Sequence, residues 1–87
     1  FADRSYQADG SLTPRSQAGA IVSSAGEAAA QAVSIAVEKR IFATDGSELL
    51  INAQTICLHG DAPHSDKYAR AVVRSLKAAG VEIRALA

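Results

Sequence analysis

The residues best suited to carry out chemistry are His59, Gly60 and Asp61, which directly follow a continuous apolar run at residues 55–58. An imidazole changes charge near neutral pH and can act as an acid, a base or a metal ligand. A nearby carboxylate can orient that imidazole, bind a substrate amine or accept a proton. The glycine between them lets the backbone turn or approach a ligand closely. The same residues also fit a structural arrangement in which Asp61 caps the following turn, and the residue types alone do not separate the two.

Two other polar groups can join such a site. Arg15, Ser16 and Gln17 lie in a long polar loop, where the arginine offers a two-pronged donor for a carboxylate or phosphate. Asp3 and Arg4 fall at another expected strand end and can share a rim with the histidine. Both groups have structural alternatives. A loop arginine is commonly solvated or paired with a nearby acid, and an adjacent Asp-Arg pair is commonly structural.

Two helices are expected after the loop at residues 5–22. The first begins at Ser24, because Ser24 and Glu27 have the spacing of a capping box, and it ends near residues 39–40. The second has Ser65 as its expected N-cap and ends before Gly80, which suits a left-handed terminating position. The expected apolar stripes are Ala29, Ala32, Val33, Ala36 and Val37 in the first helix, and Ala69, Val72, Val73, Leu76 and Ala79 in the second.

The strand signals surround these helices. Asp45-Gly46 between two apolar runs predicts a hairpin over residues 41–51. Residues 55–58 predict a strand buried on both faces, and residues 81–85 predict a strand with one wet face. This order indicates an α/β fold with parallel strands, crossover helices and one hairpin. Two helices cannot cover both faces of such a sheet, so we expect either a fragment or an obligate partner.

Composition restricts the functional class. Nine basic side chains balance nine acidic ones, which argues against long-range attraction to nucleic acid or an anionic membrane. One cysteine, Cys57, excludes an intrachain disulfide, and its apolar run predicts an inert buried thiol. The chain shows no membrane-spanning run and no secretory signal, so a cytoplasmic protein is expected. It also contains no methionine, and a fragment of a longer chain is the simpler interpretation.

The histidines do not by themselves indicate a metal site. His59 and His64 are five positions apart across a proline turn, not on one helix face, and a third ligand would have to come from elsewhere. No metal ligand is therefore assigned, and a divalent metal is without support from the sequence.

Three segments together, in this order and at these spacings, resemble the C-terminal third of the LamB/YcsF family. They are Phe1-Ala2-Asp3-Arg4, Pro14-Arg15-Ser16-Gln17 with Gly19-Ala20, and Thr55-Ile56-Cys57-Leu58-His59-Gly60-Asp61. The resemblance covers nearly the whole chain. It implies that residues 1–87 are the C-terminal fragment of a single domain, an irregular (β/α) barrel similar to the polysaccharide deacetylases.

The resemblance also implies a function. Members of the family are the A subunit of 5-oxoprolinase, which acts with B and C subunits and ATP to open 5-oxo-L-proline to L-glutamate. By this resemblance Asp3, His59 and Asp61 would be catalytic. Arg4, Arg15, Ser16 and Gln17 would bind substrate or anion. The family's N-terminal acidic and histidine-containing segments are absent, so the fragment alone is expected to be inactive.

Two alternatives stay open at this point. The chain can be a non-catalytic binding or assembly module whose apolar helix faces dock a partner, such as another copy or the remainder of the barrel. It can also be a metal-dependent deacetylase-like hydrolase, by analogy of fold alone.

Overall fold

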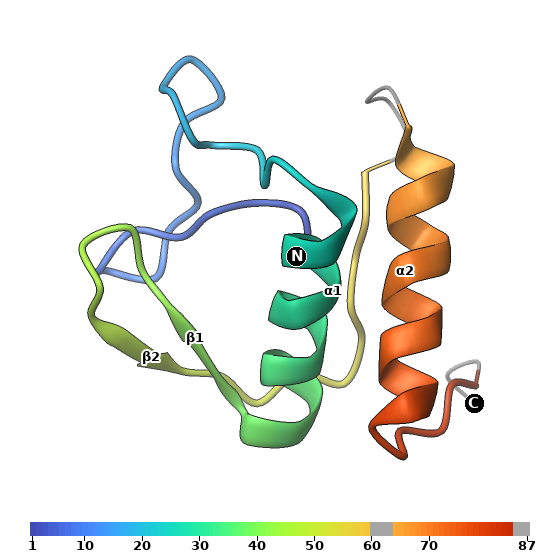
Figure 1. The fold of residues 1–87 in the computed structure, drawn as a ribbon. Coiled ribbons are helices and arrows are strands. Elements are labelled where there is room, and N and C mark those ends of the chain that lie inside the picture. Colours follow the sequence, from blue (N-terminus) through green and yellow to red (C-terminus); the bar gives the residue numbers. More distant parts are fainter. Residues whose placement is uncertain (60–63, 85–87) are drawn as a thin grey trace.

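The structure, a computed structural model, describes residues 1–59 and 64–84. Its elements in chain order are α1 (Ala25–Val33), a π-helical turn η1 (Ser34–Glu38), β1 (Arg40–Phe42), β2 (Glu48–Leu50) and α2 (Ser65–Ala78). Helix α1 stands between the β1–β2 hairpin and α2, as Figure 1 shows, and the N-terminal segment crosses close to α1. The long loop that precedes α1 is pinned by two isolated antiparallel bridges, Arg4 to Ile21 and Tyr6 to Leu12.

Helix α1 begins where its capping signal predicts. The Ser24 hydroxyl accepts a hydrogen bond from the Glu27 backbone N–H at 3.1 Å, which satisfies one of the unpaired donors of the first turn. The carboxylate of Glu27 accepts from the Ser23 hydroxyl at 3.2 Å, so the second arm of the expected capping box goes to the preceding serine. The N-cap at Ser24 is confirmed, but the Glu27 carboxylate binds the Ser23 hydroxyl instead of the Ser24 backbone N–H.

The end of α1 differs from the expected stripe. The π-helical turn η1 lets Lys39 adopt a left-handed conformation with φ of 57° before β1 begins. Because a π turn bonds i to i+5, it rotates the residues that follow Val33. Ile35 is consequently buried, whereas Val37 is 51% exposed.

The expected hairpin is confirmed. Strands β1 and β2 pair antiparallel with Ile41 opposite Leu49. The Asp45 carboxylate accepts from both the backbone N–H and the hydroxyl of Ser47, and Gly46 takes a φ of 88° that favours glycine. The local turn chemistry therefore sets the register.

The prediction of Ser65 as the N-cap of α2 is wrong by one residue: Ser65 is the first helical residue, and the N-cap is His64, which has a φ of 64° and no side-chain capping bond. Its buried face consists of Val72 and Leu76, whereas the expected Val73 is 40% exposed. Gly80 ends the helix with a φ of 83°, as predicted.

Small side chains form most of the main core. One cluster joins α1, α2 and the N-terminal segment, and a second lies between the loop, η1 and β1. The buried members are Ala2, Ala28, Ala29, Ala32, Val72 and Leu76 in the first, and Tyr6, Ile35 and Ile41 in the second.

The prediction of strands at residues 55–58 and 81–85 is wrong for the part of them that the structure describes. Residues 55–58 and 81–84 contain no strand, and within the described chain the hairpin is the only sheet. Cys57 is exposed, so the predicted buried thiol is also wrong. A strand requires a neighbour along its edge, and a groove of about 610 Å³ is instead lined by residues 53–56 together with Val72, Val73 and Leu76 of α2. A parallel sheet and a barrel remain a prediction.

Within the described residues, no helix combines the length and the apolar character that crossing a bilayer requires.

Candidate functional site

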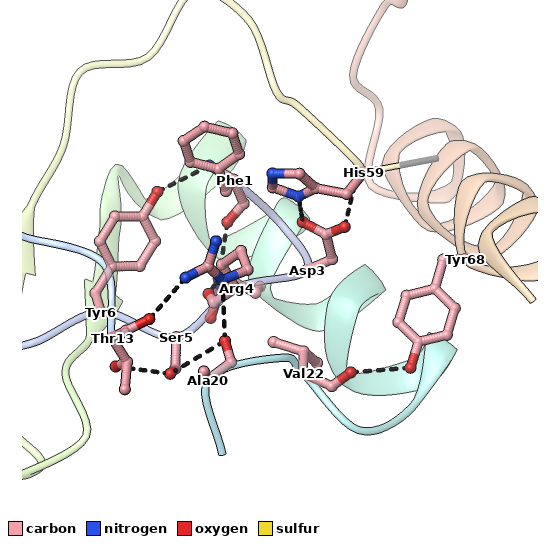
Figure 2. A network of polar contacts seen from close by, with 11 residues as sticks. Phe1, Asp3, Arg4, Ser5, Tyr6, Thr13, Ala20, Val22, His59 and Tyr68 are labelled. Atoms are coloured by element: carbon pink, nitrogen blue, oxygen red, sulfur yellow. Dashed lines mark hydrogen bonds and ion pairs between the residues drawn. The ribbon is translucent and has the colours of Figure 1, made fainter. Parts of the chain in front are cut away.

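Asp3 and His59 form a tightly coupled pair (Figure 2). One carboxylate oxygen of Asp3 accepts a hydrogen bond from the His59 backbone N–H at 2.7 Å, and the other lies 3.0 Å from Nδ1 of the same residue. The Asp3 side chain is 8% exposed and that of His59 is 27% exposed. A buried carboxylate thus fixes both the backbone and the ring of a histidine that solvent still reaches.

The contacts decide the ionisation of Asp3. Burial alone would raise the pKa of this carboxyl group, but the two hydrogen bonds from His59 and the charge of its imidazole act in the opposite direction. The balance lowers the pKa of Asp3 below its ordinary value of 3.8. Asp3 is therefore a carboxylate at neutral pH.

An ionised carboxylate only accepts hydrogen bonds, so Nδ1 of His59 must carry a proton. In the neutral ring, Nε2 is then the basic nitrogen and is available to a ligand. The Phe1 ring stacks on the imidazole, with centroids 5.0 Å apart and planes inclined by 20°. The ring is held at one edge by Asp3 and on one face by Phe1, which is the arrangement that an oriented general base requires.

Gln31 on α1 fixes the backbone on both sides of Asp3. Its side-chain amide donates to the carbonyl of Phe1 at 2.9 Å and to the carbonyl of Arg4 at 2.8 Å. A single helix residue therefore holds the segment that carries the carboxylate, and the sequence patterns gave no indication of it.

The segment that carries His59 is attached to the same backbone. The N–H of Ala2 donates to the carbonyl of Cys57 at 3.1 Å, and the N–H of Val22 donates to the carbonyl of Asp3 at 2.9 Å. Ala2 is fully buried beneath this junction. Three stretches that are distant in sequence thus meet at Asp3.

A cavity of about 260 Å³ opens beside the pair. It is lined by Asp3, Ile21, Val22, Ser23, His59, Ser65 and Tyr68. The Tyr68 hydroxyl donates to the carbonyl of Val22 at 2.9 Å and so connects α2 to the wall of the cavity. The volume is just below the range of about 300–1,000 Å³ typical of drug-sized ligands, which suits a small metabolite.

Sequence reasoning missed Tyr68 as a site residue. The available signal was its position in the first turn of α2, shortly after the His-Gly-Asp segment. A tyrosine there has an apolar ring for the core and a polar end for a ligand. The ring does pack against the main core cluster.

Arg4 points away from His59, as Figure 2 shows. Asp3 lies at a bend of the backbone and lines the cavity, whereas Arg4 is not among the lining residues. The guanidinium is buried and donates to the carbonyl of Thr13 at 2.6 Å and to that of Ala20 at 3.3 Å. It holds the long loop in place, and its expected role in binding substrate or anion stays a prediction.

The other predicted residues are not brought to the cavity by the described chain. Arg15, Ser16 and Gln17 are exposed in the loop and are not among the lining residues. Asp61 lies outside the described residues. Across residues 1–59 and 64–84, no group of three His, Cys, Asp or Glu side chains is placed to hold a metal ion. The proposed roles of these four residues stay predictions.

Similarity to known proteins agrees with the sequence motifs. The chain is 49% identical over 86 residues to the 5-oxoprolinase A subunit of Tolumonas auensis, covering 99% of this chain and 34% of that protein. Its structure is similar to the crystal structure of the lactam utilization protein from Thermus thermophilus, with a TM-score of 0.91 and 40% identity. That match also covers 99% of this chain and 34% of the other.

The chain therefore spans about a third of the length of these relatives. The family profile described as LamB/YcsF matches all of residues 1–87. The chain belongs to the LamB/YcsF family.

Proposed function

We propose that this chain supplies part of the active site of a 5-oxoprolinase A subunit, which opens 5-oxo-L-proline to L-glutamate at the expense of ATP. The observation that carries the proposal is the Asp3–His59 pair in the wall of a cavity suited to a small metabolite. The similarity to a lactam utilization protein and to a 5-oxoprolinase A subunit supports the choice of a lactam as substrate.

The pair suits the chemistry of lactam opening. The reaction breaks the ring C–N bond and adds water, so the carbonyl carbon becomes a carboxylate and the ring nitrogen becomes an amine. His59 accepts a proton from the attacking water at Nε2, while Asp3 holds the proton on Nδ1 and stabilises the imidazolium that forms. ATP is coupled to this step by transfer of its γ-phosphoryl group to the lactam oxygen with release of ADP; two water molecules then complete ring opening and release of phosphate, and the proton taken up by His59 passes to the leaving ring nitrogen. Arg15, Ser16 and Gln17 are proposed to reach substrate or phosphate when the loop meets the rest of the enzyme.

The test is 5-oxoproline-dependent ATP hydrolysis by the intact gene product that contains this chain, assayed together with its B and C subunits. Replacing His59 with Ala should reduce turnover by about 10²- to 10⁴-fold, the usual contribution of a general base. His64→Ala is the matched control, because His64 is an exposed histidine outside the described cavity lining. Turnover unchanged in His59→Ala, with the protein folded, would remove the proposed role.

A second candidate is an assembly module, and one observation favours it. The groove of about 610 Å³ is lined largely by apolar side chains, among them Val73 and Ile83, which are 40% and 46% exposed. In this case Val73→Asp would abolish association with the partner subunits. His59→Ala would leave both association and turnover unchanged, so the two variants separate the candidates.

A further inference from the structure

Two lining residues of the cavity, Ser65 and Tyr68, come from α2, whereas the Asp3 carboxylate comes from the N-terminal segment. Figure 2 shows the Tyr68 side chain pointing toward Val22. Its hydroxyl lies 2.9 Å from the carbonyl oxygen of Val22.

That hydrogen bond determines what the phenol can offer to a ligand. A carbonyl oxygen only accepts, so the single proton of the Tyr68 hydroxyl must be directed at Val22. The remaining capacity of the phenol oxygen is its lone pairs. Toward the cavity, Tyr68 is therefore an acceptor.

The same limitation applies to three other lining side chains, those of Ser23, Asp3 and His59. The Ser23 hydroxyl donates to the carboxylate of Glu27 at 3.2 Å, which commits its proton in the same way. Asp3 is ionised and carries no donor. His59 directs its Nδ1 proton to Asp3 and leaves Nε2 as an acceptor in the neutral ring. The walls at these four residues favour a ligand that brings hydrogen-bond donors.

We propose that Tyr68 is a specificity-determining residue whose phenol oxygen accepts the hydrogen bond of the substrate's ring N–H. The inference rests on the proposed function and goes beyond it by assigning an orientation. The amide edge of the lactam faces Tyr68 and Ser23. The carboxylate of 5-oxo-L-proline faces away from Asp3, because two carboxylates in a small cavity repel each other.

The proposed orientation determines which substrates the cavity accepts. The lactone with the same ring size and carboxylate is nearly isosteric with 5-oxo-L-proline but has an oxygen in place of the N–H. Bound in the same orientation, it places lone pairs against the lone pairs of Tyr68. A site that hydrogen-bonds an N–H rejects an analogue that lacks it, because a polar group is then left unpaired.

The test measures dissociation constants by calorimetry for the intact gene product with two probes, 5-oxo-L-proline and the lactone 5-oxotetrahydrofuran-2-carboxylate. Wild-type protein should bind the lactam more tightly than the lactone. Tyr68→Phe should weaken the binding of the lactam by about 3- to 10-fold, the range of one neutral hydrogen bond, and change the dissociation constant of the lactone by less than about 2-fold. The preference of the protein for the lactam over the lactone should therefore be smaller in this variant.

Comparing two probes within one variant removes the effect of partial misfolding, which lowers both affinities together. Tyr6→Phe is the matched control, since Tyr6 is the other tyrosine of the chain and lies outside the cavity lining, and it should keep the wild-type preference. Equal weakening of both probes in Tyr68→Phe would mean that Tyr68 acts only through Val22, and no change in either would mean no contact. Both results overturn the inference while leaving the proposed function standing. Failure of wild-type protein to bind the lactam would overturn the proposed function as well.

Discussion

Asp3 and His59 are 56 positions apart, yet both carboxylate oxygens of Asp3 bind that one residue, one at the backbone and one at the ring. The backbone contact at 2.7 Å positions the end of the extended segment, and the ring contact at 3.0 Å fixes the tautomer. The two side chains therefore act together, and removing either one should have the same effect as removing both.

Asp3→Asn and His59→Gln should be non-additive in turnover. Each single variant should reduce turnover of the intact enzyme by about 10²-fold or more, because each destroys the oriented base. The double variant should be hardly worse than the poorer single variant, as for residues that act as one unit. Steady-state kinetics of the three variants completes the cycle. Losses that multiply would show two independent roles.

The lowered pKa of Asp3 predicts how stability depends on pH. The unfolded chain binds a proton at this carboxyl near pH 3.8, whereas the folded protein binds it only at lower pH. The stabilisation is therefore complete above about pH 5 and is lost as the pH falls through the lowered value. Asp3→Asn should show a shallower fall in the free energy of unfolding over this acid range, measured by urea titration.

Asp66→Asn serves as the control for this experiment. Asp66 is an exposed carboxylate, paired with Arg70 on α2, and its removal leaves Asp3 in place. The variant should keep the acid dependence that Asp3 supplies. If the free energy of unfolding of Asp3→Asn depended on pH as steeply as that of the wild type, the contact with His59 would not lower the proton affinity of Asp3 in the folded state.

Arg4 should matter chiefly for stability. Its buried guanidinium donates to two carbonyls of the long loop, and hydrogen bonds from charged groups contribute about 1.5–3 kcal/mol each. Arg4→Ala should thus lower the free energy of unfolding by about 2–4 kcal/mol, whereas Arg74→Ala, at an exposed position on α2, should change it by about 0.5 kcal/mol or less. Chemical denaturation of the two variants measures the difference. Equal, small effects would contradict a structural role.

Arg15 should show the opposite behaviour if the loop binds an anion. It is exposed, so Arg15→Ala should leave the free energy of unfolding within about 0.5 kcal/mol of wild type. The KM for 5-oxoproline or ATP should rise about 10-fold, in the range of a lost charged hydrogen bond. Kinetics at varied substrate and ATP decide which ligand is affected. An unchanged KM for both would remove Arg15 from the proposed site.

Local signals predicted local structure well. The serine cap at Ser24, the turn at Asp45-Gly46 and the left-handed Gly80 are each decided by a few neighbouring residues, and the structure has all three. These features depend on backbone conformations and short-range hydrogen bonds, which the residue types specify directly.

The predictions that were wrong or incomplete all depend on residues that are distant in the sequence and therefore do not appear in a local sequence pattern. Residues 55–58 have the composition of a buried strand, but burial requires an adjacent strand, and Cys57 is exposed in the described chain. The pairing of Asp3 and Arg4 in one motif suggested a shared site. Their side chains instead have different partners, His59 for Asp3 and the carbonyl of Thr13 for Arg4. Tyr68 was not identified because its importance arises from Val22, 46 positions earlier.

The amide of Gln31 gives helix α1 a second task beyond packing. A helix turns by about 100° per residue, so an insertion or deletion of one residue between Ser24 and Gln31 would carry this amide away from the two carbonyls that flank Asp3. Natural length variation should consequently be tolerated in the exposed loop before α1 and rejected within its first two turns, even though α1 itself lines none of the cavity.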